Sequence, residues 1–235
     1  MTTIDDPIRF AERLLALLEE GSFTATYKFA VLLGLMDLCL EHSNRFGEPP
    51  PMVTTRQLAE KVIGLYWSHT TPFETIDGEV LKQNSGKPAV ILSRIQAFRN
   101  DAAPDLGCTL HRARLTSPTE FQALLDEVEW TLVLMPLPKL QRFGGAEARF
   151  IYEIGWDDNI KRSLFRNTHE FDNRISFVGD AAQHLVRLAP LLRPLIKQKW
   201  VEMVGKLNHL EVAQLESFLF GADRVSLQPV RAPLL

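Results

Sequence analysis

The polar side chains at the start of residues 54–67 could bind nucleic acid. Arg56, Gln57 and Lys61 are long hydrogen-bond donors, and they follow two threonines, which are typical helix caps. A short capped helix with such donors near its start is what helix-turn-helix proteins place in the major groove of DNA. Glu60 lies on the same face, so an ordinary solvated helix is the alternative interpretation.

Basic side chains elsewhere in the chain could hold phosphate groups. The candidates before residue 100 are Lys28, Lys82, Lys87, Arg94 and Arg99. A second basic stretch, from Arg187 to Lys206, is opposed only by Glu202. Basic helices grip phosphate backbones, but they also cover ordinary protein surface. We predict a nucleic-acid contact surface made by Arg56, Gln57, Lys61, Lys28, Arg94, Arg99, Arg193 and Lys197.

A third polar cluster lies in "RNTHEFDNR", residues 166–174, and holds His169, Glu170, Asp172 and Asn173. These residue types bind divalent metals or act as acid and base. A metal needs ligands that converge from fixed backbone, and no partner motif is visible, so a polar turn is the competing interpretation. The sequence also lacks the GxxxxGK[ST], GxGxxG, GxSxG and HExxH motifs. We therefore assign no catalytic residue, no metal ligand and no cofactor to this chain.

Composition and charge suit a soluble globular protein with no overall basic excess. The 235 residues are 46% hydrophobic and 23% charged, with a formal net charge of −3. Residues 1–80 carry 6 Lys and Arg against 12 Asp and Glu, whereas residues 81–235 carry 20 against 17. Any contact with a polyanion is therefore expected in the second half of the chain or in a local patch.

Several features predict a cytoplasmic protein that does not enter a membrane. Cys39 and Cys108 are unclustered and form no CxxC motif, which suits a reducing compartment. The N-terminal residues are acidic and are not followed by the apolar segment of a signal peptide. No run reaches the roughly 18 apolar residues of a membrane span.

Periodicity and cap residues predict an α+β protein that is predominantly helical. Helices are expected over residues 5–20, 22–43, 54–67, 89–101, 117–130 and 210–221, and over 181–209 as two helices or one kinked at Pro190 and Pro194. Residues 131–140 are expected to be extended, with short strands within 148–156 and 173–180. This gives a helical N-terminal half with a winged-helix-like element, a small β insertion near 130–178 and a helical C-terminal third. Residues 1–128 and 129–235 form two segments that could also pack as one domain.

Several blocks together resemble the N-terminal region of bacterial HNH endonuclease-domain proteins. The blocks are "FTATYKFAVLLGLMDLCLE", "TTRQLAEKVIGLYW", "VLKQNSGKPAVILSRIQAFR", "FIYEIGW", "LAPLLRPLIKQKWVEMVGKLN" and "FLFGADR". The "TATYKFA" and "TTRQLAEKV…LYW" blocks are the most distinctive, and the resemblance covers most of the chain.

The resemblance implies an accessory role next to a nuclease. In that family a phrase like "FLFGADRVSLQPVRAPLL" leads into a ββα nuclease domain, where a histidine activates water near a divalent metal. The family's catalytic histidine and asparagine have no matching positions here, so the metal would belong to the missing domain. The resemblance therefore implies a non-catalytic module that binds DNA. The alternative is a protein-interaction or sensing domain that controls a nuclease domain or partner protein, and such a domain can form a homo-oligomer.

Overall fold

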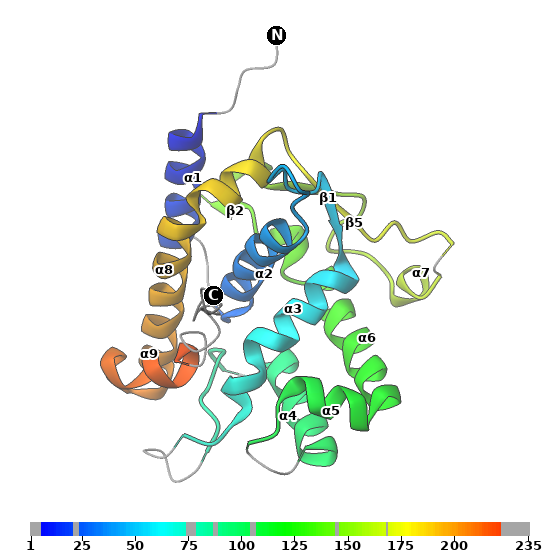
Figure 1. Cartoon of the computed structure of the whole chain (residues 1–235), viewed down its shortest axis with the longest axis vertical. Coiled ribbons are helices and arrows are strands. Elements are labelled where there is room, and N and C mark those ends of the chain that lie inside the picture. Colours follow the sequence, from blue (N-terminus) through cyan, green and yellow to red (C-terminus); the bar gives the residue numbers. More distant parts are fainter. Residues whose placement is uncertain are drawn as a thin grey trace, which may run out of the picture.

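The computed structural model describes residues 6–20, 24–73, 79–86, 89–103, 107–143, 146–167 and 169–221. It confirms an α+β, predominantly helical fold (Figure 1). The described helices are α1 (Pro7–Glu20), α2 (Tyr27–Glu41), α3 (Thr55–Trp67), η1 (Ser68–Thr70), α4 (Val90–Ala102), α5 (Leu110–Thr116), α6 (Pro118–Leu134), η2 (Leu137–Lys139), α7 (Arg162–Phe165), α8 (Ala181–Asn208) and α9 (Val212–Phe220). The described strands are β1 (Met52–Thr54), β2 (Arg142–Phe143), β3 (Ala146–Glu147), β4 (Tyr152–Ile154) and β5 (Arg174–Phe177).

Helix α2 is the central rod of the molecule. Its residues are apolar on nearly every face, and a helix with this pattern must be surrounded by other elements. Ten of its residues, between Phe29 and Cys39, are buried. Helix α8 packs along one side of α2 and α3 along another, and α1 lies beside α8 (Figure 1).

Helix α3 begins with a capping box that the sequence of its first residues specifies. The Thr54 hydroxyl accepts from the Gln57 backbone N–H at 3.2 Å, and Gln57 Oε1 accepts from the Thr54 N–H at 2.8 Å. Both orphan donors at the helix start are thereby satisfied. Further along, Leu58, Val62 and Tyr66 are fully buried and pack α3 into the core.

A three-stranded antiparallel sheet joins the two halves of the chain. Its strand order is β1-β5-β4, and Val53 of β1 pairs with Ile175 of β5. Both side chains are buried in one core cluster, which includes residues from α1 to α9. Residues 1–128 and 129–235 therefore share a sheet and a core in the described part of the chain.

Two proline-containing segments, residues 131–140 and 181–208, bear on the sequence prediction. Helix α6 continues to Leu134 and η2 covers Leu137–Lys139, so the expectation that residues 131–140 are extended is wrong for nearly the whole segment. Proline restricts mainly the residue before it, and only Met135, which precedes Pro136, is extended. Residues 181–208 form one continuous helix, because Pro190 and Pro194 lie on its exposed face, where water can take the carbonyls that they free. No helix among the described residues is long and apolar enough to cross a membrane.

A buried polar network ties the start of α2 to α8. Gln83 is 1% exposed, and its Oε1 accepts from the Thr26 hydroxyl and from Trp200 Nε1, each at 2.8 Å. Its Nε2 lies 3.5 Å from His69 Nδ1, and His69 Nε2 lies 3.0 Å from the carbonyl oxygen of Leu219 in α9. The two contacts are both satisfied when His69 is neutral with its proton on Nε2.

We predict that Gln83→Met lowers the free energy of unfolding by about 3 kcal/mol, because two buried donors lose their acceptor. Urea denaturation followed by circular dichroism measures the change. The matched control is Gln183→Met on the exposed face of α8, which should change stability by less than about 0.5 kcal/mol. Equal effects of the two substitutions would contradict the role of the network.

The two thiols should differ sharply in reactivity. Cys39 is fully buried, and burial raises the pKa of its thiol to about 12, whereas Cys108 is partly exposed. At pH 8 only about one Cys39 in ten thousand is a thiolate, which is the reactive form. In the native protein a disulfide reagent should therefore modify the Cys108 thiol quickly. The substitution Cys108→Ser should abolish this fast phase of labelling. Rapid labelling of Cys39 in the folded Cys108→Ser protein would contradict this prediction.

Candidate functional site

Arg56, the first of the predicted DNA contacts, is bound to its own chain. Its guanidinium pairs with Asp126, lies 3.1 Å from Glu129 Oε2 and donates to Gln122 at 2.6 Å. All three acceptors belong to α6. Glu129 is only 5% exposed and also accepts from the Thr55 hydroxyl. Arg56 therefore neutralises a buried carboxylate and fixes α3 to α6.

Three other predicted cations also form ion pairs between helices. Lys61 pairs with Glu41 of α2, and Arg94 NH2 lies 3.9 Å from Glu127 of α6. Arg193 of α8 pairs with Asp37 of α2, which is half-buried. Asp37 thus contacts Arg193, which lies in the basic stretch from Arg187 to Lys206.

The remaining predicted contacts are placed as follows. Arg99 is 4% exposed and donates to the Trp67 carbonyl at 2.7 Å, so it lies inside the protein. Lys197 Nζ lies 4.8 Å from the centre of the Phe220 ring. Lys28 is half-buried, and desolvation lowers the pKa of its ammonium. Gln57 uses its side chain in the capping box.

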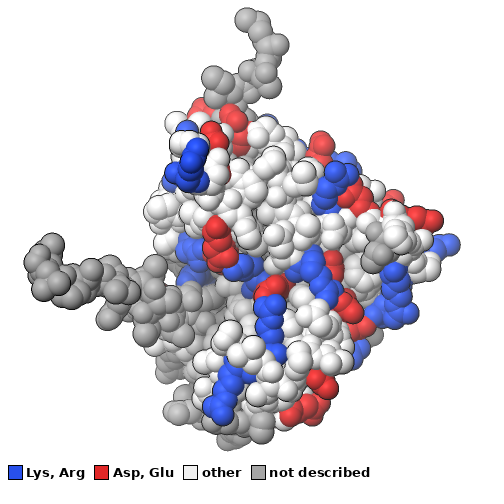
Figure 2. Space-filling view, turned by 45° about the vertical axis from the view of Figure 1, so that its right-hand side comes forward, with Lys and Arg blue, Asp and Glu red and all other residues white. Residues whose placement is uncertain are grey.

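The eight predicted residues therefore do not gather into one basic surface. They are distributed over α2, α3, α4 and α8, and each cation contacts groups of its own chain. On the face shown in Figure 2, Lys and Arg are separated by Asp and Glu and by wide uncharged areas. Lys87, also considered a phosphate contact, lies outside the described residues, as do residues 222–235.

The polar cluster at residues 166–174 forms no metal site among its described members. His169 and Glu170 are exposed. Asp172 is held by Arg174, whose Nε and NH2 donate to its two oxygens at 2.7 Å. These hydrogen bonds lower the pKa of Asp172. No group of three His, Cys, Asp or Glu residues in the described ranges is placed to hold a metal ion.

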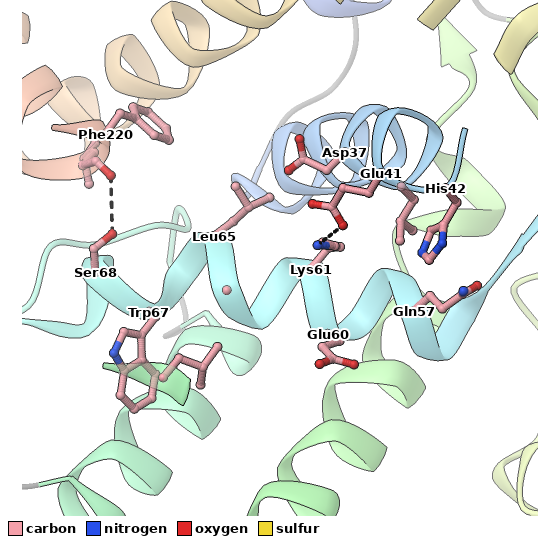
Figure 3. Close-up of a pocket in the computed structure, with 14 residues that line it drawn as sticks. Asp37, Glu41, His42, Gln57, Glu60, Lys61, Leu65, Trp67, Ser68 and Phe220 are labelled. Carbon is pink, nitrogen blue, oxygen red and sulfur yellow. Dashed lines mark hydrogen bonds and ion pairs between the residues drawn. The ribbon is translucent and has the colours of Figure 1, made fainter. Parts of the chain in front are cut away.

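A groove runs along the predicted helix, and we call it the α3 groove. Its volume is about 690 Å³, within the usual range for ligand sites. The outward stripe Gln57, Lys61, Gly64 and Ser68 forms its base, with α2 on one side and α9 at the far end (Figure 3). Apolar side chains contribute to its lining, namely Leu38, Leu65, Trp67, Leu110, Leu219 and Phe220.

The wall formed by α9 is fixed to η1 and α8. Ser68 Oγ and His69 Nε2 both contact the Leu219 carbonyl, at 3.4 and 3.0 Å. The Phe220 ring packs edge-on against His69 and Trp200, with centroid distances of 5.5 Å. The shape of this end of the groove is therefore set by buried contacts.

Gly64 lies in the middle of the groove base and has no packing role. Nothing lies within 4 Å of the position that a Cβ would take there, and the residue is exposed. A glycine inside a helix costs about 1 kcal/mol relative to alanine. Sequence reasoning missed this residue, although a glycine within a helical pattern is a signal for close backbone approach.

The charged residues of the α3 groove are more often acidic than basic. Its lining includes the carboxylates of Asp37, Glu41 and Glu60, and the ammonium of Lys61. Each carboxylate is paired within the chain: Glu41 with Lys61, Asp37 with Arg193 and Glu60 with Arg114. The outer face of the predicted recognition helix is therefore not a basic surface.

We predict that Arg56→Ala lowers the free energy of unfolding by about 2 kcal/mol, because Glu129 stays buried without its cation. Arg187→Ala, an exposed substitution on α8, is the control in chemical denaturation. The opposite result, Arg56→Ala as stable as Arg187→Ala, would mean that the α3–α6 ion pairs contribute nothing. Any loss of DNA binding in Arg56→Ala must be compared with this loss of stability.

Comparison with known proteins places the chain in a family whose description names no activity. A family model, DUF8808, described as a domain of unknown function, matches residues 9–218. No significant match to the chain was found among the curated proteins or among the solved structures. The matched range includes α2, α3 and every residue of the α3 groove except Leu219 and Phe220. Because the match covers most of its length, the chain belongs to the DUF8808 family.

Proposed function

We propose that this chain is a protein-interaction domain that binds an amphipathic, basic segment of a partner protein in the α3 groove. The observation that carries the proposal is the exposed, glycine-centred base of that groove, next to apolar side chains on three neighbouring elements. Domains that bind a partner helix use such a groove to cover the apolar face of the incoming segment.

The length of the groove suits a short helix. From Gln57 to Ser68 the base covers eleven helical steps, which is about 17 Å at 1.5 Å per residue. A partner helix of about three turns would lie along it. The absence of a side chain at Gly64 would let the partner's backbone come close to α3 at the centre of the contact.

The chemistry of the lining favours a partner with both apolar and basic residues. Leu65 and Leu110 are partly exposed and offer apolar surface for anchoring side chains, and buried apolar anchors supply most of the affinity in such contacts. The carboxylates of Glu41 and Glu60 are partly exposed and can accept further hydrogen bonds from Lys and Arg at the edges of the segment. Complementary charge of this kind speeds association and excludes wrong partners. The same carboxylates disfavour a phosphate backbone at this surface.

Nucleic-acid binding and the link to a nuclease stay predictions. The predicted cations form ion pairs and hydrogen bonds within the chain. We therefore favour the alternative, a domain that binds a partner protein. A docking groove would suit the accessory region that the HNH resemblance implies. It would let this region recruit or control a partner without catalysis of its own.

Selection from a displayed library of 16-residue segments should yield sequences with apolar residues at helical spacing and Lys or Arg at their edges. Gly64→Phe should weaken binding of a selected segment at least tenfold, because the ring extends into the groove from a position where a Cβ meets no neighbour. Gly64→Ala is the matched control, and it should keep binding within about threefold. Fluorescence anisotropy of the labelled segment measures both affinities.

The proposal fails if no segment is selected, or if Gly64→Phe binds a selected segment as well as the wild type does. Short duplex and single-stranded DNA are titrated in parallel at two salt concentrations. Salt-sensitive DNA binding that survives Gly64→Phe would support the nucleic-acid prediction instead. A second copy of the chain in the groove would appear as concentration-dependent dimerisation that Gly64→Phe abolishes.

A further inference from the structure

A second cavity lies between α6, α7 and the segment that leads into β5, and we call it the α6–α7 pocket. Its volume is about 580 Å³, and its lining includes Arg56, Glu127, Arg162, Phe165, Arg166 and Phe171. Helix α7 projects at the edge of the molecule beside α6 (Figure 1). This pocket is on the α6 side of α3, whereas the α3 groove follows the stripe that begins at Gln57.

The carboxylates of the α6–α7 pocket are already engaged with cations of the same chain. Asp126 and Glu129 both contact Arg56, and Glu129 also accepts from the Thr55 hydroxyl. Glu127 pairs with Arg162 and lies 3.9 Å from Arg94. The negative charge of the pocket is therefore compensated before any ligand enters.

Three hydrogen-bond donors of the same pocket have no acceptor in the described part of the chain. Arg162 Nε is buried and makes no hydrogen bond there. The Arg166 guanidinium lines the pocket and is exposed, and no ion pair or hydrogen bond joins it to the described residues. The same holds for the half-buried side-chain amide of Asn173. A ligand rich in acceptors, above all an anion, would satisfy the accessible donors of Arg166 and Asn173.

One side of the pocket is aromatic. The rings of Phe165 and Phe171 lie 5.3 Å apart and line the cavity. The Trp130 ring packs against Phe165 with a centroid distance of 5.3 Å and the Trp156 ring against Phe171 at 5.1 Å, so both phenyl rings are held by aromatic neighbours. A rigid aromatic wall next to guanidinium groups favours a flat ring over a flexible chain.

We propose that the α6–α7 pocket binds a small planar anion, that is, an aromatic ring that carries a phosphate or a carboxylate. Arg166 and the side-chain amide of Asn173 bind the anionic group, and the rings of Phe165 and Phe171 contact the aromatic ring of the ligand. Arg162 keeps its ion pair with Glu127, which fixes its guanidinium in place. The volume accommodates a ligand of the size of a mononucleotide.

The test is isothermal titration of the full chain with adenosine monophosphate, benzoate, adenosine and inorganic phosphate. Adenosine monophosphate carries a phosphate and benzoate a carboxylate, so these two probes distinguish the anionic groups. We expect at least one of them to bind with a dissociation constant below about 1 mM. Adenosine and inorganic phosphate should bind at least tenfold more weakly. Arg166→Gln should lower the affinity for that probe at least tenfold. The exposed control Arg187→Gln should leave the affinity unchanged.

The proposal is overturned if neither ring-bearing anion saturates by about 10 mM, or if Arg166→Gln binds as the wild type does. Inorganic phosphate binding as tightly as adenosine monophosphate would also overturn it, because the aromatic wall would then play no part. Gly64→Phe should leave this binding intact, since Gly64 lies in the other cavity. The outcome is therefore independent of the proposed protein-interaction function.

Discussion

The burial of α3 between α2 and α6 is the constraint on which the rest of the structure depends. The approach of α3 to α2 is so close that a Cβ at Gly34 would lie 2.8 Å from Leu58 Cδ1. On the other side, Arg56 is fixed by carboxylates of α6, one of which is buried. With these two sides occupied, only the stripe from Gln57 to Ser68 is left to form the base of the groove.

Ion pairs between helices explain why a chain with 26 Lys and Arg residues presents no basic surface at the predicted site. Arg56, Lys61 and Arg193 each join two helices, and for Arg56 and Arg193 these helices are distant in sequence. Apart from the contact of Arg56 with buried Glu129, such partly exposed pairs contribute little to stability, but they neutralise charges that would otherwise attract phosphate. The cavities at α3 are therefore distinguished by shape, aromatic rings and unmatched donors rather than by net positive charge.

Local signals in the sequence predicted most of the elements, because periodicity and caps act over a few residues. The apolar α2 and the capped α3 are where the pattern placed them. The partner of each charged side chain could not be predicted, since Arg193 meets Asp37 only when α8 packs on α2. The same limit hid both cavities, which are built from residues far apart in the chain.

The most direct test of the account is an amide NMR spectrum of the full chain with a selected basic segment and, separately, with a short DNA duplex. The account predicts that the segment changes the chemical shifts of the Gly64 and Ser68 amides. It also predicts that DNA at physiological salt leaves the chemical shifts of the α3 amides unchanged. Shifts of the Arg56, Gln57 and Lys61 amides on adding DNA, with Gly64 unaffected by the segment, would contradict it.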